Sequence, residues 1–153
     1  MRFDNKKILV VNTGLKDYLM PDKISLFSDK FLITEKYFQD KPEHFLLLET
    51  FAQTATYHQR RLHNFEKHHF LLSIDSFNFD EELPENRNYT VKAELLNQSE
   101  SVGVYKVMTS LNGKEITGLL KIASSDKINK INQKYYKKVF ECLQKKQRNA
   151  SDY

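Results

Sequence analysis

One acidic residue, Glu49, lies where the sequence predicts a buried apolar helix face. It follows Phe45 by four residues and precedes Ala52 by three, so in a helix it falls on or beside the apolar stripe. Burying a carboxylate costs free energy unless the group is paired or protonated. A carboxyl group kept protonated near neutral pH is what a general acid requires. Glu49 is therefore the candidate catalytic residue; the alternative is that it reaches solvent at the edge of the stripe.

The residues around Glu49 predict one long helix over residues 43–65. Pro42 and Glu43 suit the first turn of such a helix. The pattern turns polar at residues 58–61. Before that point the apolar arc is very wide, which predicts a helix buried on most sides. The arc comprises Phe45, Leu47, Leu48, Phe51, Ala52, Ala55 and Tyr57.

Strand patterns surround this helix. Residues 7–39 predict one or two short strands with loops, and four longer strands are predicted over 70–79, 89–97, 102–111 and 115–123. Asn112 and Gly113 join the last two as a type I′ hairpin turn. No internal repeat or interdomain linker divides the chain. The predicted fold is α+β, an antiparallel sheet wrapped around one long central helix.

The basic charge lies mainly in a C-terminal segment. The net charge is +4, but residues 124–153 carry +5 and residues 1–123 carry −1. Ile128, Ile131, Tyr135, Val139 and Cys142 or Leu143 recur at helical spacing and predict an amphipathic helix over 126–147. We therefore predict a domain over residues 1–123 with an appended basic helix and tail over 124–153. Its lysines are either simply solvated or dock an acidic partner; no motif for nucleic-acid binding accompanies them.

The segment LLLETFAQ at residues 46–53 resembles the Glu-x-x-Ala-Gln helix of the 3-hydroxyacyl-acyl-carrier-protein dehydratases. Residues 31–40 resemble the strand that leads into the active-site loop of that family. Residues 70–79 with Leu83-Pro84 are similar to the next strand and its turn, although Glu85 stands where the family has Gly. The resemblance covers about residues 25–123 and implies the hotdog fold, in which an antiparallel sheet wraps one long helix.

The resemblance implies dehydration of a 3-hydroxyacyl thioester. In that family a histidine takes the C2 proton, the helix carboxyl protonates the departing C3 hydroxyl, and backbone N–H groups polarise the thioester carbonyl. Glu49 occupies the carboxyl position, with Gln53 one turn later as its hydrogen-bonding support. The resemblance further implies a dimer in which the histidine of one subunit faces the carboxyl of the other, and an acyl carrier protein or acyl thioester as partner.

The loop that should supply the histidine departs from the family pattern. It is shorter, it lacks glycine, and the histidine position falls at Lys41 or at Tyr37, depending on the alignment. Lysine and tyrosine are almost wholly protonated at neutral pH and make poor bases. His44 is the nearest histidine; it is either a relocated base or an ordinary residue of the first helical turn. The later histidines lack the spacing of a helical metal site, so neither a metal nor a cofactor is expected.

Several functional hypotheses remain open at this point. The chain is a dehydratase with a relocated base, a degenerate or partner-dependent subunit in a homodimer or in a heterodimer with a histidine-bearing paralogue, or a hotdog acyl thioesterase. A non-catalytic subunit that binds acyl groups or carrier proteins is a further alternative. An acyl tunnel is expected from Phe45, Leu48, Phe77 and Phe79, and carrier-protein docking from Lys36, Lys41, Lys134, Lys137 and Lys138. No membrane span or secretory signal is recognisable, which predicts a cytoplasmic protein.

Overall fold

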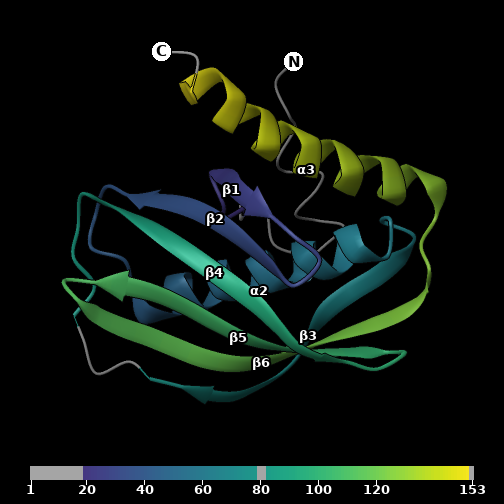
Figure 1. The fold of residues 1–153 in the computed structure, drawn as a ribbon, viewed down its shortest axis with the longest axis horizontal. Coiled ribbons are helices and arrows are strands. Elements are labelled where there is room, and N and C mark those ends of the chain that lie inside the picture. Colours follow the sequence, from purple (N-terminus) through teal and green to yellow (C-terminus); the bar gives the residue numbers. More distant parts are fainter. Residues whose placement is uncertain (1–18, 79–81, 152–153) are drawn as a thin grey trace.

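One helix is enclosed by an antiparallel sheet. The computed structural model describes residues 19–78 and 82–151. Figure 1 shows helix α2 (His44–Leu62) lying across one face of the sheet, and helix α3 (Lys130–Ser151) along its margin beside β1. The strand order is β1-β2-β4-β5-β6-β3. The strands are β1 (Lys23–Phe27), β2 (Phe31–Phe38), β3 (Lys67–Phe77), β4 (Arg87–Gln98), β5 (Val102–Leu111) and β6 (Lys114–Lys127). The predicted α+β architecture is confirmed.

Helix α2 is the inner element, as its wide apolar arc predicts. It packs against β2, β3, β4, β5 and β6. Leu47, Phe51 and Ala55 are fully buried, and their face meets inward-facing sheet residues such as Tyr89 and Val107. The helix begins one residue later than expected and ends three residues earlier. Because the sheet covers this helix on several sides, polar side chains along it are forced into enclosed positions.

The β5–β6 hairpin follows the sequence pattern closely. Residues of β5 alternate between buried and half-buried along most of the strand, as a half-buried strand should. Asn112 and Gly113 form the turn with positive φ angles of 51° and 80°. A type I′ turn needs positive φ at both central residues, and asparagine and glycine tolerate it best. The predicted turn is confirmed.

Helix α3 differs from its predicted register. Strand β6 continues to Lys127, and α3 begins at Lys130 rather than at residue 126. The buried stripe consists of Tyr136, Val139, Phe140 and Leu143, which pack with Ile24 of β1 in a second hydrophobic cluster. Ile131, predicted to lie on the stripe, is 67% exposed. At about 100° per residue, Ile131 lies roughly 130° around the helix from the centre of the face that carries these four residues, so it cannot share their contact with the body. Within residues 19–78 and 82–151, no helix is long and apolar enough to cross a membrane.

The C-terminal half of α2 is more enclosed than its polar sequence indicates. His58, Gln59 and Arg60 are buried, although the sequence suggests that the helix turns polar there. The guanidinium of Arg60 lies 4.0 Å from the ring centroid of Tyr136 on α3 and 4.9 Å from that of Tyr57. Helix α3 and β1 help to bury the C-terminal half of α2, and this burial cannot be read from the sequence of α2 alone.

A glycine in β5 makes room for one of these buried side chains. A Cβ added at Gly103 would lie 2.6 Å from Gln59 Nε2 and 2.9 Å from Gln59 Cδ. Gln59 cannot simply move away, because its Nε2 donates to Tyr105 Oη at 2.8 Å and to Gln98 Oε1 at 2.5 Å.

We expect Gly103→Ala to lower the free energy of unfolding by about 1–3 kcal/mol, the usual cost of overpacking. Urea denaturation measures this change. Combining it with Gln59→Ser, which shortens the obstructing side chain, should cost less than the sum of the two single changes. Additive losses would show that the close approach to Gln59 is unimportant.

Candidate active site

Glu49 is held by Gln53 on the enclosed helix. Gln53 Nε2 donates to Glu49 Oε1 at 2.8 Å, one helical turn away. The other end of the Gln53 amide, Oε1, accepts a hydrogen bond from the backbone N–H of Met20 at 2.8 Å. Gln53 is buried, whereas Glu49 is half-buried. The Glu49 carboxyl group is therefore oriented by a buried neighbour while part of its surface stays accessible.

A pocket opens at the N-terminal end of α2. Its volume is about 480 Å³, and it is lined by residues 41–45 together with Glu82 and Leu83. Phe45, which is 54% exposed, lines it. Glu49 lies one turn after Phe45, and residues four apart on a helix share a face at about 5–6 Å between Cβ atoms. The pocket therefore lies one helical turn from the oriented carboxyl group.

The N-terminus of α2 also faces this region. Glu43 is the N-cap residue, and its side chain makes no capping hydrogen bond. Leu46 N donates to the Glu43 carbonyl at 3.0 Å. The earlier amides of the turn have no carbonyl partner within a helix, and the helix dipole adds positive potential there. Such a site can polarise the carbonyl oxygen of a bound thioester.

The two residues at the family's histidine position lie in other interactions. Tyr37 is exposed on β2, and its hydroxyl donates to Asn86 Oδ1. Lys41 Nζ lies 3.0 Å from Glu82 Oε1, and both side chains are exposed. Neither residue contacts Glu49 through any interaction recorded for the described residues. His44 is exposed and lines the pocket. Of the three candidate bases, His44 and Lys41 therefore line the pocket and Tyr37 does not.

The expected acyl-tunnel residues divide into two groups. Leu48 and Phe77 are partly buried and pack against the core, with Phe77 5.3 Å from the ring of Phe51. Phe45 alone among the described candidates lines the pocket, and Phe79 lies outside the described residues. Pro42 and Leu83 also line it. Sequence reasoning missed both as lining residues, although each adjoins a segment that it named.

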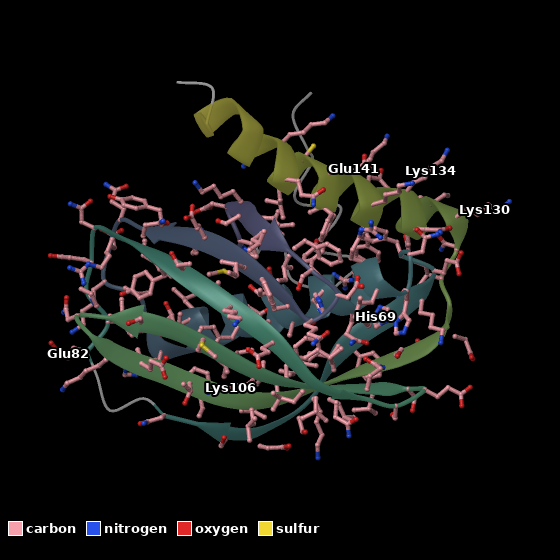
Figure 2. All side chains as sticks on the ribbon, viewed as in Figure 1. His69, Glu82, Lys106, Lys130, Lys134 and Glu141 are labelled. Carbon is pink, nitrogen blue, oxygen red and sulfur yellow. The ribbon has the colours of Figure 1, made fainter. Side chains whose placement is uncertain are left out.

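The candidate docking lysines lie in different parts of the molecule. Lys36 is half-buried and lies 3.4 Å from Asp22. Lys134, Lys137 and Lys138 are exposed on α3. Figure 2 shows Lys134 on the opposite side of the molecule from Glu82, a lining residue of the pocket.

Three of the remaining histidines, His58, His63 and His69, hydrogen-bond to groups other than Glu49, and His58 and His69 are buried. His58 Nε2 lies 2.8 Å from the Ser28 carbonyl, so this nitrogen carries the proton and Nδ1 accepts from Tyr105 Oη at 2.7 Å. His63 Nδ1 lies 2.6 Å from His69 Nε2 in nearly parallel rings. Burial, Arg60 and His63 lower the pKa of His69 to about 3. Among residues 19–78 and 82–151, no group of three metal-ligating side chains is found.

Comparison with known proteins addresses the fold. No family model matches the sequence, and no curated protein matches it. Among solved structures, a mutant of a thioesterase enzyme from Staphylococcus aureus matches with a TM-score of 0.60 and 12% identity, covering 67% of this chain and 92% of the other. A hypothetical thioesterase with coenzyme A from Streptococcus pneumoniae gives 0.60 and 13%, with coverages of 70% and 88%. The fold is the hotdog fold.

A third hotdog neighbour has a different activity. The dehydratase heterocomplex ApeI:P from Xenorhabdus doucetiae matches with a TM-score of 0.58 and 16% identity, covering 75% of this chain and 86% of the other. The hotdog neighbours therefore include both thioesterases and a dehydratase. The expected hotdog architecture is confirmed; at these identities the likeness concerns the fold alone.

Proposed function

We propose that this protein is a dehydratase-like subunit that acts on 3-hydroxyacyl thioesters, with Glu49 as its acid. The observation that carries the proposal is the Gln53-oriented carboxyl group of Glu49, one turn from a pocket at the helix N-terminus. A buried amide that fixes one carboxyl oxygen leaves the group with a single preferred orientation. General acid catalysis needs such orientation before it needs a matched pKa.

In the proposed reaction, a base removes the proton at C2 and electron density moves onto the thioester carbonyl. The first-turn amides of α2 stabilise that oxygen. The C2–C3 double bond then forms as the C3 hydroxyl leaves, and Glu49 supplies the proton that converts it to water. The products are a 2-enoyl thioester and water, and Glu49 recovers its proton from the base or from solvent.

The base is the missing element, and we propose that a second subunit supplies it. His44 is the only histidine that lines the pocket in the described part of the chain. A homodimer therefore repeats the same shortened loop twice, whereas a histidine-bearing hotdog partner completes the site that contains Glu49. The name of one structural neighbour, a dehydratase heterocomplex, is consistent with a paired arrangement of this kind.

Strand β3 supports a dimer because it is an edge strand with an apolar surface. It lies at one end of the strand order and pairs only with β6 in the described part of the sheet. An exposed edge with large apolar side chains is a site for pairing with another chain. Its exposed side chains include Phe70, Leu71, Leu72 and Ile74.

We expect Leu72→Lys to weaken dimerisation by about 100-fold or more, because an unpaired charge would be buried in the interface. Analytical ultracentrifugation over a concentration series measures the change. Leu26→Lys is the matched control, since Leu26 has the same 52% exposure and lies on the opposite edge strand, β1. Dissociation caused by the Leu26 change, or a dimer left unaltered by the Leu72 change, would contradict the assignment of the interface to β3.

The acyl group is proposed to arrive on an acidic acyl carrier protein. Lys41 lines the pocket and is exposed, so it can meet an acidic surface near the pocket mouth. Lys36 is the second residue proposed for this contact; it is less exposed than Lys41, and each of the two lysines is paired with an acid, Asp22 and Glu82 respectively. Of the α3 lysines, Lys134 lies on the opposite side of the molecule from Glu82, and we assign carrier-protein docking to Lys41 first.

A thioesterase is the second candidate, because several structural neighbours are described as thioesterases. In that case Glu49 would activate water as a base or attack the thioester as a nucleophile. The third possibility, an acyl- or carrier-binding subunit without chemistry of its own, requires only the pocket and the docking surface.

Two assays separate these candidates. Hydration of a 2-enoyl thioester, followed by loss of ultraviolet absorbance, reports the dehydratase reaction in reverse. Release of free thiol from an acyl thioester reports hydrolysis. We expect the purified chain alone to hydrate slowly, and to gain activity when co-purified with a histidine-bearing hotdog subunit. Thiol release in place of hydration would identify a thioesterase, and the absence of both activities in the complex would leave only the binding subunit.

A further inference from the structure

Helix α3 presents positive charge that the rest of the protein does not neutralise. No ion pair recorded for the described residues involves its exposed lysines. Glu141 is the one exposed acid among its described side chains. The exposed lysines are Lys130, Lys134, Lys137, Lys138, Lys145 and Lys146. The net charge of residues 1–123 is −1, so the molecule has a positive face on an otherwise near-neutral body.

Most of this charge forms one row. At about 100° per residue, all these lysines except Lys146 fall within an arc of roughly 100°, and Lys130 to Lys145 extend over about 22 Å. The opposite face of α3 is fixed by burial of Tyr136, Phe140 and Leu143. Figure 2 shows Lys130 and Lys134 on the side of α3 that points away from the sheet. The lysine row therefore lies on the solvent-exposed face of α3.

An apolar margin runs beside the lysine row. Ile131 is 67% exposed, and Tyr135 and Cys142 are half-buried on the same side of the helix, with Tyr135 also packed against the second hydrophobic cluster. An exposed isoleucine beside cations has no role in the packing of α3 on the body. At a phospholipid surface, lysines pair with phosphate groups while neighbouring apolar side chains reach between them.

We propose that α3 docks this protein on the surface of an anionic phospholipid bilayer. A straight row of cations matches a plane of phosphate groups, and the near-neutral body lets the field of α3 orient the whole molecule toward that plane. An acidic protein fits these observations less well. Lys130 and Lys134, at the start of the row, lie on the opposite side of the molecule from pocket residue Glu82, and the exposed apolar side chain of Ile131 adds nothing to an electrostatic contact. The proposal is independent of the reaction at Glu49.

Co-sedimentation with vesicles tests the proposal on the full chain. We expect binding to vesicles of phosphatidylcholine with one third phosphatidylglycerol, and no binding to phosphatidylcholine alone. Binding should disappear at about 0.5 M salt, where charges are screened within a few ångströms. The triple variant Lys130→Gln, Lys134→Gln, Lys137→Gln should bind about 100-fold more weakly, at roughly fivefold for each lysine.

The matched control removes three cations from the sheet instead, at Lys92, Lys106 and Lys114. This triple glutamine variant should bind anionic vesicles within about twofold of the unchanged protein. Glu141→Gln should strengthen binding, because it removes the one acid within the lysine row. Thermal melting verifies that each variant is folded.

Four results would overturn the proposal. The first is no binding to anionic vesicles at low salt. The second is an equal loss in the α3 and sheet variants, which would reduce the effect to net charge. The third is weaker vesicle binding by the Glu141 variant, which would contradict an attraction between the lysine row and anionic lipid. The fourth is capture of an acidic carrier protein by α3 without vesicle binding, which would indicate a protein partner with a matching charge pattern.

Discussion

Glu49→Gln is expected to lower the kcat of the active complex by about 10²–10⁴-fold, the usual contribution of general acid–base catalysis. Glutamine keeps the shape of the side chain but cannot deliver a proton to the departing hydroxyl. KM should change little, since the pocket at the helix N-terminus is lined by other residues. Initial rates of 2-enoyl thioester hydration over a range of substrate concentrations measure both quantities.

Two further variants make this result specific. Glu66→Gln removes an exposed carboxyl group just beyond the C-terminal end of the same helix and should leave kcat within a few-fold, because Glu66 does not line the pocket. Gln53→Ala leaves Glu49 without its 2.8 Å donor and should lower kcat by an intermediate amount through loss of orientation. Full activity in the Glu49 variant would refute its role as the acid, whatever the partner subunit supplies.

The fold could be predicted because local and global patterns agree. Leu47, Phe51 and Ala55 repeat at helical spacing, and the alternation in β5 with Asn112-Gly113 defines a hairpin. The sequence prediction was wrong at the C-terminal end of α2, because packing between distant segments determines burial there. His58, Gln59 and Arg60 have polar side chains, and residues of β3, β4, β5 and α3 that are distant in the chain contact them and make their positions buried ones.

The candidate site was predictable only in part. The spacing of Glu49 and Gln53 by four residues is visible in the sequence, and their hydrogen bond follows from helix geometry. The pocket depends on Glu82 and Leu83, which are nearly forty residues away in the chain. No periodicity signals such a long-range approach. The roles of Tyr37, Lys41 and His44 depend on a loop whose shape is set by these same distant contacts, and they stay predictions.

The buried end of α2 holds positive charge and neutral histidines together. Arg60 packs between the Tyr57 and Tyr136 rings, and its Nη2 donates to the His69 carbonyl at 3.4 Å. His69 in turn shares a hydrogen bond with His63. One ring nitrogen must donate and the other accept, so the pair cannot carry two extra protons without losing this contact. Lys67, at the start of β3, lowers the pKa of both histidines further.

This arrangement predicts a marked loss of stability in acid. The pKa of His69 falls from 6.5 to about 3 on folding, through burial first and then the charges of Arg60, His63 and Lys67. The unfolded chain therefore takes up the proton first as the pH drops below 6.5. The free energy of unfolding should be highest above that pH and decline by up to about 1.4 kcal/mol per pH unit from this one group. The decline should level off below the folded pKa, near pH 3.

Urea denaturation across this pH range measures the effect, and His69→Phe isolates it. Phenylalanine resembles imidazole in shape and cannot be protonated, so the variant should have a shallower slope between pH 6.5 and pH 4. Any difference between the two proteins at pH 8 reports packing and the lost His63 contact, and only the difference in slope reports titration. Burial also lowers the pKa of His58 and His63, so some slope should persist in the variant. Equal slopes would mean that His69 titrates as it does in the unfolded chain, and that the surroundings of His63 and His69 tolerate a protonated His69.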